Sequence, residues 1–551
     1  MTYSWKKAST TLLLDSHSRL FLLAGMSTLP LFCAAFIFIF QAGLPDRCLD
    51  IDMSMLELYT IHASHGEQYL GPYSRFGWNH PGPSYFYVMA PLYRLSGQCA
   101  SSLFLTARII NLISFTFLAF IVAGTARKDD RILAIWTIVL LTFYLDRLGP
   151  DLLGNPWNPW IVILPFGVFV FSLASFSTGR IAFLPVIVFS GSFLVQTHVG
   201  TVPCVLALCA TSLALIIVFS GWTGSRPYYV FRAGNGAWIG LSIVLAAVMW
   251  TLPLLEEMRH RPGNFSKLIS FFWSTSGGNT FFDAFPIIAK QVAWFPSYLL
   301  KKMPVAIPAF EYDLLAEFFT VVQMVSLPFV FRNAVTKGFR FRACLTALGG
   351  VGVLAGMWSV LRIQGDVFPY LISWMSAIGL ANWAVIGTAC IEYVDGKLRV
   401  HDTWKRVRSR AAEVIAVIAV TAMVAMLIPG FVQVSRRPVA ESLKVRMLSR
   451  TLISYLREND VKRPVIHFDW SQWSVEAGVI VQIRKSGLDF AVKNTRSKHQ
   501  ENWPLLFPAS YGPRGRDEKH IVFGTSLLKS DPRAVHIGGY GETHIYLWRD
   551  K

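Results

Sequence analysis

The residues of this sequence best suited to chemistry are concentrated between Leu44 and Ser102. Asp50 and Asp52 stand two positions apart at the start of a stretch with a helical pattern. The dipole and free N–H groups at a helix amino terminus keep a nearby carboxylate ionised. Such a carboxylate can accept a proton from a hydroxyl group or bind a divalent cation. Simple capping of the helix by the two side chains is the alternative interpretation.

An aromatic segment that also carries cations follows this helix, from Gly71 to Tyr87. It places Arg75 and His80 among aromatic rings, on a backbone stiffened by three prolines. A sugar site needs flat apolar faces and hydrogen-bond donors, and a phosphate leaving group needs cations. An aromatic belt at a membrane interface is the alternative interpretation. It explains the Tyr and Trp residues but not the positions of Arg75, Asn79 and His80. The side chains predicted to bind acceptor or sugar are Glu57, Tyr73, Trp78, Asn79, Tyr85 and Tyr87.

Later segments supply further candidate side chains. The charged cluster Glu256, Glu257, His260 and Arg261 could contact a phosphate or a cation, although a solvated loop is the simpler interpretation. We predict Arg75, His80, Arg261 and Arg362 as the phosphate-binding cations. Arg362 is included because it ends an apolar run, and charges at membrane depth are costly unless they function. His198 is an additional candidate, with a hydrogen-bonded structural role as the alternative.

Several well-known site patterns are missing from the sequence. It has no zinc-binding Cys/His spacing, no phosphate-binding glycine-rich loop, no nucleotide-binding fingerprint and no serine nucleophile elbow. These absences argue against a nucleotide-sugar donor.

The composition indicates that membrane-spanning helices position these residues. Hydrophobic residues make up 53% of the 551 residues and charged residues only 15%, which leaves too few polar side chains to cover a water-facing surface. About eleven apolar runs are long enough to span the hydrocarbon core. Their approximate bounds are Leu20–Gly43, Leu103–Gly124, Ile132–Leu148, Pro159–Ser177, Ile181–Gln196, Val202–Trp222, Ala237–Leu255, Glu317–Phe331, Ala343–Ile363, Val367–Cys390 and Val414–Val434.

The distribution of basic residues predicts the orientation. The net charge is +18, and Lys and Arg are enriched in every second connection, as the positive-inside rule requires of cytoplasmic segments. The charge thus indicates membrane association and not nucleic-acid binding. The first run is too long for a signal-peptide core, so we expect a cytoplasmic amino terminus and a multi-pass protein of the bacterial inner membrane. Leu44–Ser102, Glu256–Ala316 and the tail are then periplasmic.

The tail from Ser435 onward differs in pattern from the rest. Helical stretches at Val439–Asn459 and Val475–Ser486 alternate with short strands at Pro464–Asp469, Phe490–Lys493, Ile521–Gly524 and Ile545–Trp548. We therefore predict an all-α polytopic membrane domain (residues 1–434, with amphipathic helices in loop 44–102) and a small periplasmic α/β domain (residues 435–551).

Two of the seven cysteines differ from the others in position. Cys48 and Cys99 lie near the two ends of the first external loop. An oxidising compartment permits disulfides, so we predict that these two cysteines form one. The other five fall within apolar runs, as small buried hydrophobes do.

The first external loop resembles that of the GT-C superfamily of polyprenyl-phosphate-dependent glycosyltransferases. The closest likeness is to the bacterial branch that contains the lipid A aminoarabinose transferase and relatives of the protein O-mannosyltransferases. Glu57 and the Gly66 turn keep the expected separation, and Asn79-His80-Pro81 falls where that branch has a basic residue before proline. Asp50-Ile51-Asp52 replaces the usual adjacent Asp-Glu pair, so either aspartate could be the base.

The resemblance implies an inverting transfer of a sugar from a polyprenyl-phosphate donor to a cell-envelope acceptor, a glycolipid, polysaccharide or protein. Asp50 or Asp52 would act as general base, with or without a divalent cation as cofactor. Two other classes remain as alternatives. A flippase or transporter of lipid-linked saccharides would need inverted repeats and charges inside the spans, and an envelope polymerase or ligase would place its large loop later in the chain.

Overall fold

The protein divides into two compact units. The computed structural model describes residues 16–41, 44–74, 76–125, 130–222, 234–274, 278–301, 313–397, 402–468, 472–494, 519–525, 528 and 530–549. The first unit, here called the helical unit, comprises Met1–Gln41, Ala107–Trp250 and Phe272–Arg436. The second, here called the mixed unit, comprises Ala42–Thr106, Thr251–Phe271 and Arg437–Lys551. The mixed unit thus joins the first external loop to the tail.

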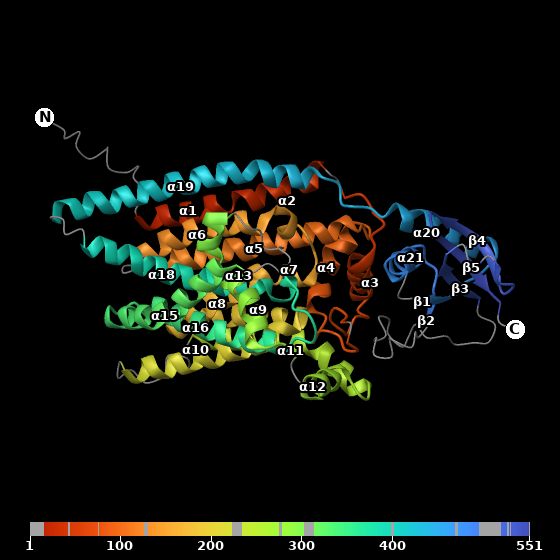
Figure 1. The fold of residues 1–551 in the computed structure, drawn as a ribbon, viewed down its shortest axis with the longest axis horizontal. Helices are drawn as coiled ribbons and strands as arrows, with labels where there is room; N and C mark the ends of the chain where they lie inside the picture. The colour runs from red at the N-terminus through yellow and green to blue at the C-terminus, as the bar shows by residue number, and fades with distance from the viewer. Residues whose placement is uncertain are drawn as a thin grey trace. The chain divides into compact units, whose positions relative to one another are not determined.

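Long apolar helices dominate the described part of the chain (Figure 1). Nine of them are long and apolar enough to cross a membrane, and the bent pair α1 and α2 would make a tenth. The predicted polytopic all-α membrane protein is therefore confirmed. The long helices are α1 Ser16–Ser27 with α2 Leu29–Gln41, α5 Ser101–Thr125, α6 Arg131–Leu153, α7 Asn158–Ile161 with α8 Ile163–Ser177, α10 Val202–Trp222, α11 Gly236–Arg259, α15 Leu314–Thr336, α16 Arg340–Leu361, α17 Pro369–Ile372 with α18 Ser376–Lys397, and α19 Asp402–Arg436.

Two of the predicted runs differ from single straight spans. The first is broken at Thr28 into two helices bent by 44°, because Pro30 cannot donate the backbone hydrogen bond that would continue the helix. The fifth begins as a 3-10 turn, Ile181–Phe183, and continues as α9, Leu184–Thr197. At 14 residues, α9 is too short to cross a bilayer along its axis.

The region between the seventh and eighth runs contains helices where a loop was predicted. They are α12 Asn264–Ser274, α13 Phe281–Val292 and α14 Trp294–Lys301. The buried side chains of α13, among them Ala284 and Ile288, face the core of the helical unit, and α13 packs against α15, α16 and α18.

Glycines allow α16 to approach its neighbours closely. A Cβ on Gly349 would overlap Asn382 Oδ1 of α18, and one on Gly352 would lie 3.2 Å from Ile378 of the same helix. Small residues at such crossings let membrane helices pack through their backbones. Asn382 in turn donates from Nδ2 to Gln323 Oε1 of α15 at 2.9 Å, so a polar contact also joins α18 to α15.

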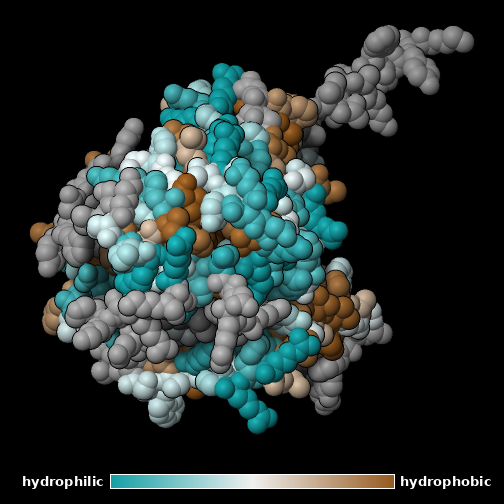
Figure 2. All heavy atoms as spheres, turned by 90° about the vertical axis from the view of Figure 1, so that its right-hand side faces the viewer, coloured by the Kyte–Doolittle hydropathy of each residue, from teal (hydrophilic) through white to brown (hydrophobic). Residues whose placement is uncertain are grey.

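The tail forms a five-stranded sheet in the order β2-β1-β3-β5-β4. Strand β1 is parallel to β2 and β3, whereas β5 is antiparallel to β3 and β4. The predicted α/β character of this segment is confirmed, and the surface on this side of the molecule is largely hydrophilic where it is described (Figure 2). The elements are α20 Leu443–Glu458, β1 Val465–Phe468, α21 Trp473–Lys485, β2 Ala491–Asn494, β3 His520–Gly524, β4 Ala534–Tyr540 and β5 Thr543–Trp548.

The first external loop contributes α3, Ile51–Ser64, and α4, Ser84–Leu95. We expected α3 to be amphipathic, with Met53, Leu56, Tyr59 and Ile61 against the lipid interface and Glu57 on the opposite face. That expectation is wrong, because every residue from Ser54 to Ser64 is buried. The helix is enclosed by α4 and by α21 of the tail, so both of its faces are covered by protein.

The predicted Cys48–Cys99 disulfide is absent, and both side chains are free thiols. Cys99 donates from Sγ to the carbonyl of Leu44 at 2.6 Å. Cys48 instead lies beside Glu441 and Arg446 of the tail, and burial together with the Glu441 charge raises its pKa. The two thiols therefore face different neighbours.

Candidate functional site

Asp50 and Asp52 flank a strained residue at the start of α3. Asp50 occupies the N-cap position but makes no side-chain capping bond. Ile51, between the two, has a backbone φ of +49°, a left-handed conformation that β-branched residues rarely adopt. Such outliers cost of order 1–3 kcal/mol and cluster at functional sites. The alternative of simple helix capping by Asp50 is therefore not what the structure shows.

The two carboxylates have different surroundings. Asp52 accepts a hydrogen bond from Tyr73 Oη, and the Tyr73 ring meets the edge of Trp473 from α21 at 6.2 Å. The half-buried Asp50 carboxylate has no hydrogen bond or ion pair within the described part of the chain. Asp52 therefore has a hydrogen-bond donor that the Asp50 carboxylate lacks within the described residues.

A short hairpin holds the aromatic segment in place. Tyr73 and Asn79 form an antiparallel bridge, and the N–H of His80 donates to the carbonyl of Pro72 at 2.8 Å. Asn264 of α12 clamps the hairpin, because its Oδ1 accepts from the N–H of Asn79 and its Nδ2 donates to the carbonyl of Asn79, both at 2.8 Å. Sequence reasoning did not single out Asn264.

The predicted acidic cluster on the later loop serves mainly to hold this clamp. Glu256 is buried and accepts from the N–H of Asn264 at 2.8 Å, while its other oxygen lies 3.2 Å from His260 Nδ1. Glu257 caps α12, because its carboxylate accepts hydrogen bonds from the N–H groups of Phe265 and Ser266. Arg261 is exposed beside them.

Aromatic side chains predicted to bind sugar divide into two groups. Trp78 and His80 meet edge to face at 5.7 Å and, with Phe271 at 5.6 Å from Trp78, form one cluster. Tyr85 is completely buried, and desolvation raises its pKa, whereas Tyr87 is only half-buried. Tyr85 is therefore part of the core of the mixed unit. Arg75, predicted to bind phosphate, lies outside the described residues.

Glu57 contributes to a buried polar network. It is 0% exposed and accepts from Tyr93 Oη of α4 and from Lys485 Nζ of α21, both at 2.9 Å. Lys485 also donates to Asp46 Oδ1 at 2.5 Å. Desolvation raises the pKa of Glu57, against the opposing effect of Lys485. Contact with a bound sugar, as predicted for Glu57, would require this network to open.

Two candidates belong to the helical unit. The Arg362 guanidinium, at the end of α16, lies 5.5 Å from the ring centroid of Trp358. His198 is 4% exposed, between α9 and α10, and its ring packs 3.0 Å from where a Cβ on Gly200 would lie.

A metal site does not emerge from the described residues, among which no three His, Cys, Asp or Glu side chains gather closely enough to hold an ion. Glu256, predicted to hold a cation, is already occupied by Asn264 and His260.

Comparison with solved structures identifies the fold. The structure of ArnT from Cupriavidus metallidurans in the apo state matches with a TM-score of 0.50 at 12% identity, over 95% of this chain and 98% of that chain. The chain has the ArnT fold. The structure of ArnT from Cupriavidus metallidurans bound to undecaprenyl phosphate covers the same shares, at a TM-score of 0.49 and 11% identity. No family model and no curated protein matches the sequence. At 12% identity this likeness concerns the fold.

Proposed function

We propose that this protein is a membrane glycosyltransferase that moves a sugar from a polyprenyl-phosphate donor to a hydroxyl group of an envelope acceptor. The ArnT fold and the motifs of the first external loop support the class of reaction. The observation that carries the assignment is the uncommitted carboxylate of Asp50, at the start of α3 beside the strained Ile51.

In this proposal Asp50 is the general base. It takes the proton from the acceptor hydroxyl as that oxygen attacks the anomeric carbon, and the bond from this carbon to the polyprenyl phosphate breaks on the opposite face. Asp52 is held by Tyr73 and helps to fix the start of α3. Positioning of a base by a neighbouring hydrogen bond is a common requirement of such sites.

Cations must neutralise the charge that develops on the departing phosphate. His80 and Arg261 carry this role in the mixed unit, with Arg75 and Arg362 as further candidates. We propose Arg261 as the most constant of these charges, because a guanidinium stays protonated throughout the physiological pH range. Trp78 and Tyr87 would shield the sugar from water.

The proposed site faces the periplasm of the bacterial inner membrane, as the basic segments of the sequence predict. That side suits a lipid-linked donor, since nucleotide sugars remain in the cytoplasm. The tail domain would help to receive the acceptor, because Trp473 and Lys485 of α21 contact the first external loop.

Transfer from a defined lipid-linked sugar would test the proposal. Purified full-length wild type, Asp50→Asn, Asp52→Asn and, as a matched control, Glu458→Gln on the exposed surface of α20 would be reconstituted with undecaprenyl-phosphate sugars and envelope acceptors. Loss of a general base lowers the rate by about 10²–10⁴-fold, and we expect this loss for Asp50→Asn alone. Full activity of folded Asp50→Asn would overturn the base assignment. Movement of the intact donor across the bilayer without sugar transfer would identify a transporter instead.

A further inference from the structure

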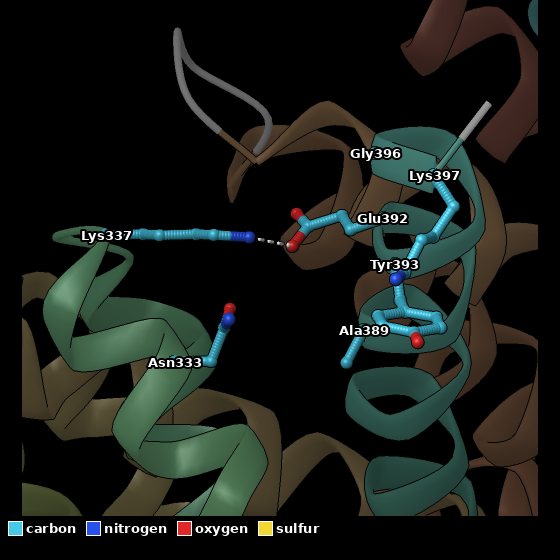
Figure 3. Close-up of a pocket in the computed structure, with 7 residues that line it drawn as sticks. All are labelled: Asn333, Lys337, Ala389, Glu392, Tyr393, Gly396 and Lys397. Carbon is cyan, nitrogen blue, oxygen red and sulfur yellow. Dashed lines mark hydrogen bonds and ion pairs between the residues drawn. The ribbon is translucent and has the colours of Figure 1, made fainter. Parts of the chain in front are cut away.

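A pocket between α15 and α18 of the helical unit lies apart from the proposed catalytic residues. Its volume is about 590 Å³, within the usual range for ligand sites. Lys337 and Asn333 extend into it from α15, and Glu392, Tyr393 and Lys397 from α18 (Figure 3). Gly396 leaves the space beside Lys397 open, because a Cβ there would meet nothing within 4 Å.

The carboxylate in this pocket is already neutralised. Glu392 Oε2 lies 2.8 Å from Lys337 Nζ, and its Oε1 lies 2.6 Å from Arg342 Nη2. Arg342 is 1% exposed and also donates from Nε to Asp130 Oδ2 at 2.8 Å. Glu392 is therefore a poor ligand for a cation, because each of its oxygens already pairs with a basic group, the exposed Lys337 or the buried Arg342.

One basic side chain of the pocket remains without a carboxylate partner. Lys397 Nζ lies 5.6 Å from the ring centroid of Tyr393 and forms no ion pair within the described part of the chain. Two lysines, Lys337 and Lys397, and one carboxylate, Glu392, line the pocket, which leaves one positive charge in excess among its lining residues. The pocket consequently favours an anion, with the Asn333 amide as an additional hydrogen-bond donor.

The surroundings of the pocket are those of a lipid headgroup. Apolar side chains of the same two helices are exposed close by in sequence, with Phe329 on α15 at 71% and Val394 on α18 at 55%. The pocket lies where α15 and α18 end in basic residues, the ends that the positive-inside rule places in the cytoplasm. Anionic phospholipids are concentrated in that leaflet, and basic pockets between membrane helices bind their headgroups. We propose that the pocket between α15 and α18 binds the phosphate headgroup of an anionic phospholipid.

Lipid titration of the purified, delipidated full-length protein tests this site. Phosphatidylglycerol, phosphatidylcholine and inorganic phosphate would be added separately, with bound lipid counted by native mass spectrometry and thermal unfolding followed in parallel. The variants are Lys397→Gln, which removes the excess charge, and Gly396→Trp, which fills the open space. Arg332→Gln is the control, because Arg332 is an exposed basic residue of α15 outside the pocket.

The expected result is tighter binding of phosphatidylglycerol than of phosphatidylcholine by the wild type. Lys397→Gln should weaken that binding about fivefold, the typical effect of one basic residue near an anionic lipid surface. Gly396→Trp should abolish it, and Arg332→Gln should leave it within about twofold. Equal binding by all four proteins would overturn the proposal. The proposal would also be overturned if inorganic phosphate bound as tightly as phosphatidylglycerol, since the rest of the lipid would then contribute nothing to the affinity.

Discussion

Lys485 of α21 and Glu57 of α3 are 428 residues apart in the sequence and form an ion pair of 2.9 Å in the mixed unit. Glu57 is 0% exposed and the Lys485 side chain 11% exposed. Gly478, also on α21, packs against the carbonyl of Leu49. A Cβ at position 478 would overlap that carbonyl oxygen. The tail therefore completes the enclosure of the helix that begins beside Asp50.

Removal of Lys485 should destabilise this enclosure. Breaking one side of a buried pair leaves an uncompensated charge and costs about 3–5 kcal/mol; we expect about 3 kcal/mol for Lys485→Met, because Glu57 can take up a proton. The midpoint of thermal unfolding in detergent measures the loss. The double variant Glu57→Gln, Lys485→Met is the control and should recover most of it. If the double variant is no more stable than Lys485→Met, the pair does not explain the loss.

The stability of the mixed unit should depend on pH through Glu57. Desolvation raises the pKa of this carboxyl in the folded protein above the value of about 4.3 in an unfolded chain. The stability that this shift contributes is complete below about pH 4.3 and is lost as the pH rises through the folded-state pKa. Glu57→Gln should thus gain in unfolding midpoint relative to the wild type between about pH 4 and about pH 7. A constant difference across that interval would contradict the raised pKa.

Sequence patterns predicted most elements of the fold, because apolar length alone distinguishes a membrane span. Strands such as Val465–Phe468 were also predicted, from their β-branched and apolar residues. Strand β4 was missed, since Gly538-Gly539 interrupts its pattern and a register shift follows His536. The bend at Thr28 was missed too, although Pro30 marks in the sequence where this apolar run loses a backbone hydrogen bond.

The candidate site was less accessible from the sequence. Asp50 and Asp52 stood out because both are acidic residues at a helix start. The partners of the acidic residues did not stand out. Tyr73 reaches Asp52 across a hairpin, and Lys485 of the tail reaches Glu57. A single sequence gives no signal for such distant pairs.

If the hydrogen bond between Tyr73 and Asp52 positions the site, removal of either partner should lower the rate of sugar transfer equally. Tyr73→Phe and Asp52→Asn both weaken the same contact, so each should lower the rate of sugar transfer by about fivefold, and the double variant no further. Steady-state rates of the three purified variants test this. A loss of more than about 100-fold for Asp52→Asn, with Tyr73→Phe near the wild-type rate, would instead make Asp52 the base.

Asn264 should control the mobility of the hairpin that carries His80. Asn264→Ala removes the acceptor of the Asn79 N–H, a buried donor whose loss of a partner costs about 1–3 kcal/mol. Hydrogen exchange at the Asn79 amide should become at least about tenfold faster, because opening of the hairpin becomes easier. Lys267→Ala, on the exposed side of α12, should leave exchange unchanged. Equal exchange in both variants would show that Asn264 is not the clamp.

Two adjacent glycines of α16 offer a matched test of helix packing in the helical unit. A Cβ on Gly349 would overlap the oxygen of Asn382, which is fully buried and held by Gln323, whereas one on Gly350 would lie 3.7 Å from Leu327. Overpacking of this kind costs about 1–3 kcal/mol, so Gly349→Ala should lower the thermal unfolding midpoint in detergent. Gly350→Ala should leave it unchanged or raise it, since alanine favours a helix over glycine by about 1 kcal/mol. Two variants of equal stability would mean that α16 and α18 do not cross as closely at Asn382 as the structure shows.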